Sequence, residues 1–276
     1  MCSCNNPLVP MPCIISGVIT ESPDTKTFCV TAANGRSLFI HQPGQCAMLG
    51  VPDIGEAMFS ISAASDGGQT LQFSIKAVGK LTNHLHKLSI GASLTVRGPY
   101  GRPFPVADTM LGQDLVFIGG GIGLAPLRPV IQHVLQNPES YGTVDIVYGA
   151  RQATDIVFKA DLFSNWPNPP NTHTHITIDK PQPEWSGHVG FVPAYVRELA
   201  FTPKTAIVCG PPVMIKYTIE TLLAMGFAKA QVYTTLEMRM KCGIGQCGRC
   251  NIGSKYICKD GPVFRSDELD YLPQEY

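Results

Sequence analysis

The sequence predicts a small antiparallel β-barrel, then an α/β domain with a doubly wound parallel sheet, then a small cysteine-rich lobe. Three observations carry this prediction. Short strand-like segments fill the first third of the chain, strand-like and helix-like segments alternate after it, and four of the ten cysteines gather near the end. We expect the barrel to span residues 1–108, the α/β domain 109–232 and the lobe 233–276.

Composition is that of an ordinary globular protein. The 276 residues exceed one typical domain, and 21 Lys and Arg balance 21 Asp and Glu, so net charge gives no indication of nucleic-acid binding. The segment Met1–Asn6 lacks the basic and apolar parts of a signal peptide, and no apolar run approaches the roughly 20 residues that span a bilayer. We therefore expect a cytoplasmic protein in a reducing compartment, with neither a membrane nor a nucleic-acid partner.

The barrel prediction rests on seven short segments of strand character separated by turn sequences such as Asp66-Gly67-Gly68. Strands at such close intervals are typical of a small antiparallel barrel. Between the last two, Leu81–Leu88 has a helical pattern. The expected strands are Cys13–Thr20, Thr27–Thr31, Ser37–His41, Ala47–Val51, Met58–Ser62, Gln69–Lys76 and Ser93–Arg97.

The pattern changes after Gly112. Leu115–Ile118 is a continuous apolar strand, and it is followed by a glycine run and an expected helix at Ala125–Leu135. Strands that alternate with helices imply a parallel, doubly wound sheet. The further strands expected are Val144–Tyr148, His175–Ile178 and Ala206–Cys209, and the further helices are Ile156–Phe163, Val192–Leu199 and Val213–Met225.

Two strand-end loops of this second half are typical of nucleotide binding. Gly119–Gly123 leads from a strand into a helix, where a ligand's phosphates can lie against backbone N–H groups at the positive end of the helix dipole. The segment Cys209–Met214 closes another strand in the same way, and both loops would lie at the carboxyl edge of the sheet, where ligands bind. Taken alone, the glycine run is also compatible with a tight turn against a closely packed helix.

Near the end of the chain, Cys242, Cys247, Cys250 and Cys258 follow the pattern C-x4-C-x2-C-x7-C with glycines between the first three. The first three have the plant-type spacing of a [2Fe-2S] cluster, although the fourth cysteine of that type is remote and here it follows closely. Zinc is the alternative, although zinc sites usually have two separated C-x2-C pairs. Two looser groups have no spacing that requires a metal: Cys2, Cys4 and Cys13, with Cys29 or Cys46 as a fourth ligand, and His173 with His175.

Along essentially its whole length the chain resembles the ferredoxin–NADP reductase superfamily, and within it the electron-transfer subunits that add a C-terminal [2Fe-2S] lobe. The ending C-G-x-G-x-C-x2-C-x7-C-x-D-G-P-x-F, from Cys242 to Phe264, is specific for that subgroup. Similar subunits occur in dihydroorotate dehydrogenase, in soluble NiFe (sulf)hydrogenases and in anaerobic sulfite reductase. The resemblance implies FAD in the barrel, NAD(H) or NADP(H) in the α/β domain and the cluster on the four cysteines.

The resemblance also implies which barrel residues contact the flavin. Members usually carry R-x-x-S on a strand, with the arginine at the flavin pyrophosphate; here Ser60 matches, and the preceding segment, from Gly55 to Met58, lacks the arginine. Val78–Thr82 matches a second flavin-contact turn, and Arg97–Gly101 completes the barrel signature. The implied flavin contacts are Met58, Phe59, Ser60, Ile61, Ser62, Ile75, Ala77, Gly79, Leu81 and Thr82.

For the nicotinamide nucleotide, the resemblance places Cys209 beside the nicotinamide as the catalytic residue. Asp179 would accept hydrogen bonds from the adenosine ribose and repel a 2′-phosphate, whereas Arg151 would accommodate one, and the balance weakly favours NADH. The implied binding residues are Gly119, Gly120, Gly121, Ile122, Gly123, Arg151, Asp179, Gly210, Pro211 and Met214.

The implied function is a relay in which a hydride from NAD(P)H becomes single electrons for the cluster and then for a partner subunit, or the reverse. The segment Gly55-Glu56-Ala57 resembles hydrogenase and sulfite reductase subunits more than those of dihydroorotate dehydrogenase. A stand-alone reductase of a small acceptor and a zinc-bearing, non-redox binding protein remain alternatives. Five cations near the cysteines, which either offset the cluster's negative charge or dock an acidic partner, are Arg239, Lys241, Arg249, Lys255 and Lys259.

Overall fold

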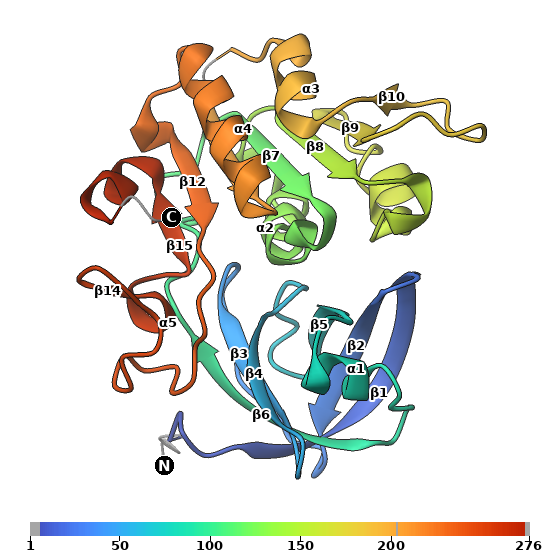
Figure 1. The fold of residues 1–276 in the computed structure, drawn as a ribbon, viewed down its shortest axis with the longest axis vertical. Helices are drawn as coiled ribbons and strands as arrows, with labels where there is room; N and C mark the ends of the chain where they lie inside the picture. Colours follow the sequence, from blue (N-terminus) through green and yellow to red (C-terminus); the bar gives the residue numbers. More distant parts are fainter. Residues whose placement is uncertain (1–5, 203, 274–276) are drawn as a thin grey trace.

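The computed structural model describes residues 6–202 and 204–273, which form a barrel, an α/β domain above it and a lobe along one side of both (Figure 1). The barrel sheet is antiparallel, with strand order β4-β3-β6-β1-β2-β5. This confirms the predicted fold of the first region. Its strands are β1 (Met11–Ser22), β2 (Thr25–Ala32), β3 (Cys46–Val51), β4 (Gly55–Ser60), β5 (Leu71–Lys76) and β6 (Ser93–Tyr100).

The barrel closes where the chain leaves β4. The Ser62 amide donates to the carbonyl of Gln72 in β5 at 2.8 Å, which brings the two edge strands of the sheet together. Alternate strand residues such as Phe28 and Phe73 point inward and form one buried core, because successive side chains of a strand face opposite sides. The short helix α1 (Lys80–Leu85) packs Leu85 against that core.

The strand predicted at Ser37–His41 was wrong. This segment is irregular: the Leu38 amide donates to the Gly68 carbonyl at 2.7 Å, and Gly68 lies in a loop rather than a strand. A Cβ at Gly68 would meet the backbone of Phe39 at 2.9 Å. The segment therefore packs against a turn, with no neighbouring strand to form a ladder.

The second sheet has the order β10-β9-β8-β7-β11-β12-β15, parallel throughout except for the β12–β15 pair. Its strands are β7 (Leu115–Gly120), β8 (Val144–Ala150), β9 (Thr172–Ile178), β10 (His188–Val189), β11 (Thr205–Cys209), β12 (Val232–Thr235) and β15 (Val263–Arg265). Its helices are α2 (Leu124–Gln136), α3 (Val192–Leu199) and α4 (Pro212–Ala224).

Helices cover both faces of this sheet. In β7, Leu115 and Phe117 pack with α2, whereas the alternating Val116 and Ile118 pack with α3 and α4. The strand order runs outward in opposite directions from the adjacent strands β7 and β11, so the topological switch point lies between them. The predicted doubly wound domain is therefore confirmed.

The helix predicted at Ile156–Phe163 was wrong in position. The helical turns lie later, with a π-helical segment at Asp161–Asn165, and Ile156 to Phe158 have no regular secondary structure. Phe158 has a φ of 52°, in the left-handed region, and its amide donates to the Glu21 carboxylate of the barrel at 2.9 Å. A right-handed helix cannot pass through that conformation. The 3-10 turns are Gly121–Gly123, Pro138–Ser140, Ala153–Asp155, Lys229–Gln231 and Ser266–Tyr271.

The C-terminal lobe packs around a small core of its own that includes Cys250 and Cys258. It contains a two-stranded sheet, a short α-helical turn and the 3-10 turn Ser266–Tyr271. Its last strand, β15, leaves the lobe and adds to the α/β sheet beside β12, with Thr234 opposite Phe264. Its elements are β13 (Asn251–Ile252), β14 (Lys255–Tyr256) and α5 (Ile257–Asp260).

Candidate functional site

The two strand-end loops predicted to bind a nucleotide pack against each other at the switch point. Gly119 and Cys209 are opposite each other in β7 and β11. A Cβ on Gly123 would lie 2.5 Å from the Cys209 carbonyl oxygen and from the Gly210 Cα. A Cβ on Gly120 would meet the Met214 sulfur. The loops therefore approach backbone against backbone, which requires glycine at Gly123.

Cys209 is buried at the end of β11, and its Sγ lies 2.8 Å from the Thr235 hydroxyl oxygen. Burial raises the pKa of its thiol to about 12, although the Thr235 hydrogen bond opposes the shift. Burial likewise raises the pKa of Cys46, in β3, to about 12. Both thiols are therefore neutral near pH 7.

Sequence reasoning missed Glu237, whose negative charge helps to raise the pKa of both Cys46 and Cys209. Glu237 is exposed to solvent as a residue, but protein atoms surround its carboxyl closely. This local burial raises the pKa of the carboxyl. Cys46 in turn lies 4.0 Å from the Ser60 hydroxyl. Residues of the barrel, of the α/β domain and of the segment before the cysteine loop thus meet at one junction. No motif in the sequence indicates this, because the three parts are distant along the chain.

The residues predicted to contact a flavin differ in accessibility. Met58, Phe59 and Ser60 are partly exposed along the edge strand β4. The side chains of Ile61, Ser62 and Ile75 lie inside the barrel, each 1% exposed or less. Of these six predicted contacts, the three partly exposed residues of β4 are therefore the ones that a ligand can reach directly.

The Ser62 carbonyl has a role of its own at the domain junction. It accepts a hydrogen bond from Arg128 of α2 at 2.9 Å, and the same guanidinium donates to Gln72 at 2.7 Å and to Asp161 at 2.6 Å. These contacts join the barrel segment that follows β4, and β5 beside it, to the α/β domain.

The second predicted flavin-contact turn is open. A Cβ added to Gly79 would meet nothing within 4 Å, and the neighbouring Val78 side chain is 74% exposed. The Thr82 hydroxyl accepts hydrogen bonds from the amides of Val78 and Gly79 at 2.9 and 2.8 Å, so it shapes the turn. Leu81 and Ala77 lie beside it, and α1 packs near β4. The half-exposed strand, the open turn and the first amides of α1 fit an FAD laid along the barrel.

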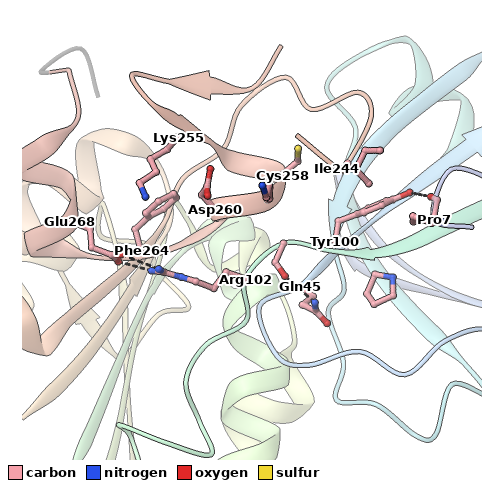
Figure 2. Close-up of a pocket in the computed structure, with 14 residues that line it drawn as sticks. Pro7, Gln45, Tyr100, Arg102, Ile244, Lys255, Cys258, Asp260, Phe264 and Glu268 are labelled. Atoms are coloured by element: carbon pink, nitrogen blue, oxygen red, sulfur yellow. Dashed lines mark hydrogen bonds and ion pairs between the residues drawn. The ribbon is translucent and has the colours of Figure 1, made fainter. Parts of the chain in front are cut away.

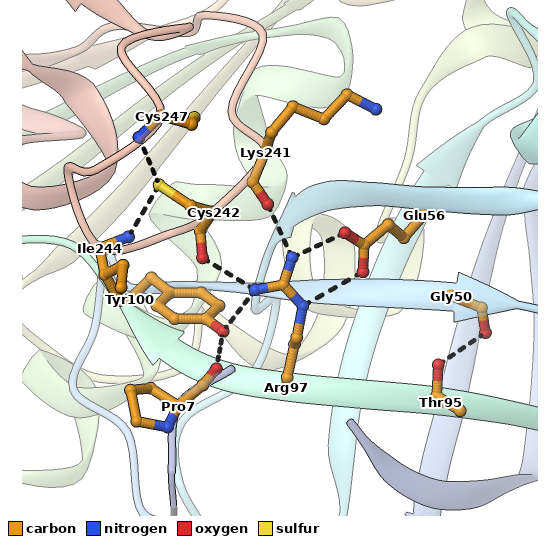
Figure 3. A network of polar contacts seen from close by, with 10 residues as sticks. All are labelled: Pro7, Gly50, Glu56, Thr95, Arg97, Tyr100, Lys241, Cys242, Ile244 and Cys247. Atoms are coloured by element: carbon orange, nitrogen blue, oxygen red, sulfur yellow. Dashed lines mark hydrogen bonds and ion pairs between the residues drawn. The ribbon is translucent and has the colours of Figure 1, made fainter. Parts of the chain in front are cut away.

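The acidic residue that stands near the missing flavin arginine has a defined partner. Glu56, in β4, forms a bidentate ion pair with Arg97 of β6, with distances of 2.7 and 3.1 Å (Figure 3). Where the resemblance to the superfamily leads us to expect an arginine, β4 carries Glu56, whose carboxylate binds the arginine of a neighbouring strand.

Arg151 and Asp179 lie at neighbouring strand ends on the carboxyl edge of the sheet, after β8 and β9. The Asp179 amide donates to the Ala150 carbonyl at 3.0 Å. Burial raises the pKa of the Asp179 carboxyl, and the positive charges of Arg151 and Lys180 oppose this. The two residues proposed to determine the preference for NADH or NADPH therefore lie close enough for the charge of Arg151 to act on Asp179.

The cysteine loop directs backbone amides at sulfur. The amides of Ile244, Gln246 and Cys247 point to the Cys242 Sγ at 3.5, 3.3 and 3.5 Å. The Gly245 amide points to the Cys258 Sγ at 3.2 Å. Burial disfavours the Cys242 thiolate, but the amide hydrogen bonds outweigh it and lower the pKa of this thiol to about 6. The loop therefore stabilises negative charge on the Cys242 sulfur, whereas burial and the neighbouring Cys250 raise the pKa of Cys258 to about 12 although the Gly245 amide opposes this.

The four thiols lie in two pairs, Cys242 with Cys247 and Cys250 with Cys258. Among residues 6–202 and 204–273, no three His, Cys, Asp or Glu side chains gather around a point that could hold a single metal ion. Zinc requires four ligands around one ion, whereas a [2Fe-2S] cluster takes two thiolates on each iron. The arrangement in two pairs fits the cluster.

The other metal candidates have structural roles. The His175 ring nitrogen lies 3.1 Å from the Asp145 carboxylate, which also pairs with Lys204 at 2.7 Å, while His173 is exposed. Cys13 donates to the Met11 carbonyl from inside the barrel. Cys2 and Cys4 lie outside the described residues.

A pocket of about 710 Å³ separates the lobe from the end of the barrel (Figure 2). The Arg102–Glu268 ion pair, with distances of 2.9 and 2.5 Å, crosses it, and Cys258, Lys255 and Lys259 line it. Asp260 lines the pocket as well, so charges of both signs face the four-cysteine loop on this side.

Family comparisons match the three regions separately. Residues 12–104 match the oxidoreductase FAD-binding domain, residues 117–220 the oxidoreductase NAD-binding domain, and residues 237–270 the iron–sulfur cluster binding domain of dihydroorotate dehydrogenase B. The FAD, nicotinamide nucleotide and iron–sulfur assignments made from the sequence are confirmed at this level. Among the described residues, no helix combines the length and apolar character needed to cross a membrane.

Curated relatives cover most of the chain. The gamma subunit of sulfhydrogenase 1 from Pyrococcus furiosus is 38% identical over 240 residues, which is 84% of this chain and 82% of the relative. A probable dihydroorotate dehydrogenase B electron transfer subunit from Methanocaldococcus jannaschii is 32% identical over 95% of this chain and 92% of its own.

Solved structures share the fold. One of the NADH-dependent reduced ferredoxin-NADP oxidoreductase has a TM-score of 0.76 at 23% identity and covers 94% of this chain and 89% of its own. A ferredoxin NADP+ reductase from Neisseria gonorrhoeae has a TM-score of 0.69 at 20% identity over 81% of this chain and 97% of its own. With the relatives and the three matched domains, these likenesses show that the chain belongs to the ferredoxin–NADP reductase superfamily, as an oxidoreductase electron-transfer subunit with FAD-binding, NAD-binding and iron–sulfur domains.

Proposed function

We propose that the chain moves electrons between NAD(P)H and a partner subunit, with Cys209 and Ser60 at the hydride-transfer junction and the four-cysteine loop at the exit. The observation that carries the proposal is the meeting of Ser60, Cys46, Cys209 and Glu237 from three distant parts of the chain. When bound, FAD exchanges a hydride pair for single electrons, and the cluster carries those electrons one at a time. The proposed domains are the FAD-binding barrel, residues 1–108, the NAD(P)-binding α/β domain, 109–232, and the [2Fe-2S] lobe, 233–276.

The chain's own residues have positioning tasks in this proposal. The backbone of the Gly119–Gly123 loop receives the nucleotide pyrophosphate beside Gly210, Pro211 and Met214. Cys209 presents an uncharged sulfur to the nicotinamide, since its pKa is raised to about 12. Asp179 selects NADH by accepting hydrogen bonds from the ribose and repelling a 2′-phosphate. No proton transfer to the substrate is required of these groups.

The partner we propose is the catalytic subunit of a complex of the soluble NiFe hydrogenase or sulfite reductase type, in the cytoplasm. The likeness to a sulfhydrogenase gamma subunit, at 38% identity, supports this type of complex. Dihydroorotate dehydrogenase subunits are the second candidate, supported by several relatives and by the matched cluster domain.

A cationic surface around the cluster loop supports docking to an acidic partner. It consists of Arg239, Lys241, Arg249, Lys255 and Lys259, all of which are exposed. Within the described part of the chain, none of these side chains has an ion-pair partner. Surface charges that lack an internal partner are available to steer a complementary surface.

The relay is tested by the visible spectrum of anaerobically purified protein before and after addition of NADH, with NADPH as a second donor. Flavin and iron–sulfur bands that bleach together support it, and bands that neither nucleotide changes would refute the nucleotide assignment. Purification as a fully active monomer that reduces a small acceptor would instead favour the stand-alone reductase.

Docking is tested by reversing charge at Arg249 and Lys255. Arg249→Glu with Lys255→Glu should slow electron delivery to the co-purified partner by at least tenfold while NADH-driven reduction of a small dye stays within twofold. The matched control is Lys87→Glu, an exposed cation just after α1, an element on the other side of the barrel from the lobe (Figure 1). An equal loss of both activities, or an equal effect of the control, contradicts docking.

A further inference from the structure

A buried arginine connects β4, which carries the proposed flavin contacts, to the cluster loop, residues 242–250. Arg97 lies in the middle of β6, opposite Met48 of β3, and its side chain is 7% exposed. Its guanidinium lies between β4 of the barrel and the loop that begins the cysteine motif (Figure 3). The position is 144 and 145 residues away from the loop in sequence, so no local pattern indicates it.

Each of the five N–H donors of this guanidinium has one acceptor. The Nε and one Nη2 hydrogen go to Glu56 at 3.1 and 2.7 Å, and the other Nη2 hydrogen goes to the Lys241 carbonyl at 2.6 Å. The two Nη1 hydrogens go to the Tyr100 hydroxyl at 2.9 Å and to the Cys242 carbonyl at 2.8 Å. Lysine has three donors and no planar fork, so it cannot make this set of bonds.

The surroundings hold the loop on this arginine. Gly243 has a φ of 83°, and a Cβ there would lie 2.7 Å from the Tyr100 ring, so the loop passes directly over that ring. The Tyr100 hydroxyl in turn donates to the Pro7 carbonyl. The two carbonyls that Arg97 holds belong to the first cluster ligand and to the residue before it. Fixing them sets the position and orientation of Cys242.

We infer that Arg97 is a positioning residue that fixes the distance and orientation between the cluster and the flavin, by clamping the Lys241–Cys242 backbone to β4 through Glu56. Electron transfer between two centres slows steeply as their separation grows, so a few ångströms of loop movement would be expressed in the internal transfer rate. Glu56, the acid that serves this clamp, lies in β4 two residues before the proposed flavin contact Met58.

Hydrogen–deuterium exchange of the holoprotein tests the clamp without relying on activity. In Arg97→Gln, exchange of the amides of residues 241–247 should rise at least tenfold. Arg102 is the matched control: its side chain pairs with the Glu268 carboxylate and donates to the Val263 carbonyl at 2.9 Å, so its side-chain hydrogen bonds within the described residues lie outside the 241–247 segment. Arg102→Gln should raise exchange at 263–268 and leave residues 241–247 within twofold.

Stopped-flow absorbance supplies the second readout. In Arg97→Gln, flavin reduction by NADH should stay within twofold, while the following reduction of the cluster should slow at least fivefold. Arg97→Lys should not rescue either readout. This kinetic arm rests on the proposed relay, whereas the exchange arm does not. A protein that neither NADH nor NADPH reduces would therefore refute the relay and leave the clamp to be decided by exchange.

The inference is overturned if Arg97→Gln leaves exchange at 241–247 unchanged, if Arg97→Lys behaves as the wild type, or if Arg102→Gln changes the 241–247 amides equally. If Arg97→Gln does not fold, Glu56→Gln decides, because it weakens the clamp from the barrel side while retaining the shape. A rise of at least threefold in loop exchange supports the clamp, and an unchanged loop refutes it.

Discussion

Alanine at Gly123 should separate the two nucleotide loops. Gly123 has φ and ψ of −61° and −11°, which alanine adopts readily, so backbone strain is not the obstacle. The obstacle is space: the new Cβ would lie 2.5 Å from the Cys209 oxygen and the Gly210 Cα and 2.6 Å from the Gly210 nitrogen, all backbone atoms. Overpacking of this kind costs about 1–3 kcal/mol, and the reduced entropy of the unfolded chain returns about 0.4–1 kcal/mol. Because the clashing atoms are backbone and cannot rotate away, the cost lies at the upper end, about 3 kcal/mol, and the net loss is about 2 kcal/mol.

Thermal unfolding followed by circular dichroism measures this loss, which corresponds to a midpoint roughly 4–8 °C lower. NADH affinity, measured by titration, should fall at least tenfold because the loop amides move apart. Gly120→Ala is the comparison for stability: its Cβ would meet the Met214 sulfur, at the far end of a flexible side chain that can rotate away. If Gly123→Ala is as stable as the wild type, or more stable than Gly120→Ala, the close backbone packing is not what the loops depend on.

Three further outcomes follow from the charges described above. Burial holds the pKa of Cys209 at about 12. The rate of flavin reduction by NADH, measured by stopped flow as a function of pH, should therefore show no transition near the ordinary thiol pKa of about 8.5. A transition there that disappears in Cys209→Ser would contradict this. Asp179→Ser should shift the kcat/KM preference at least tenfold toward NADPH and Arg151→Ala should shift it toward NADH, with unchanged ratios in both variants contradicting their assigned roles. The Arg102 hydrogen bonds hold the pKa of Glu268 at about 2, below its ordinary 4.5, so the pair stabilises the fold above pH 4.5 and this is lost as pH falls toward 2. Glu268→Gln should therefore lower the free energy of unfolding by about 1 kcal/mol, a value reduced because the pair is partly exposed to solvent. Urea titrations should give the same loss at pH 8 and at pH 5, since both lie above the pKa of Glu268 in the folded and unfolded states.

The sequence predicted the features that are local. The cysteine spacing, the glycine run after an apolar strand and the alternation of β7 are all written in neighbouring residues, and each is present as expected. The strand predicted at Ser37–His41 failed because strand formation needs a pairing partner, which no local pattern reveals. The helix predicted at Ile156–Phe163 failed because the conformation of Phe158 is set by Glu21 of the other domain.

The candidate site shows the same division. The absence of a flavin arginine near Glu56 was visible in the sequence, but its meaning was not, because Arg97 lies 41 residues further along the chain. Glu237 carried no motif and joined the junction only through the path of the chain after β12. Contacts of long sequence separation thus account for the part of the site that sequence patterns missed.

The addition of β15 to the α/β sheet determines how an electron acceptor can meet this protein. A redox lobe on a flexible linker can swing, collecting an electron at one place and releasing it at another. Here the lobe is hydrogen-bonded into the sheet beside β12, with Tyr233 opposite Arg265, while arginines of the barrel hold it from the other side. The lobe is therefore held in one position relative to the other two domains. In the proposed relay, an acceptor has to bind at the lobe, and the shape of the exposed surface around Cys247 determines which acceptors can approach closely.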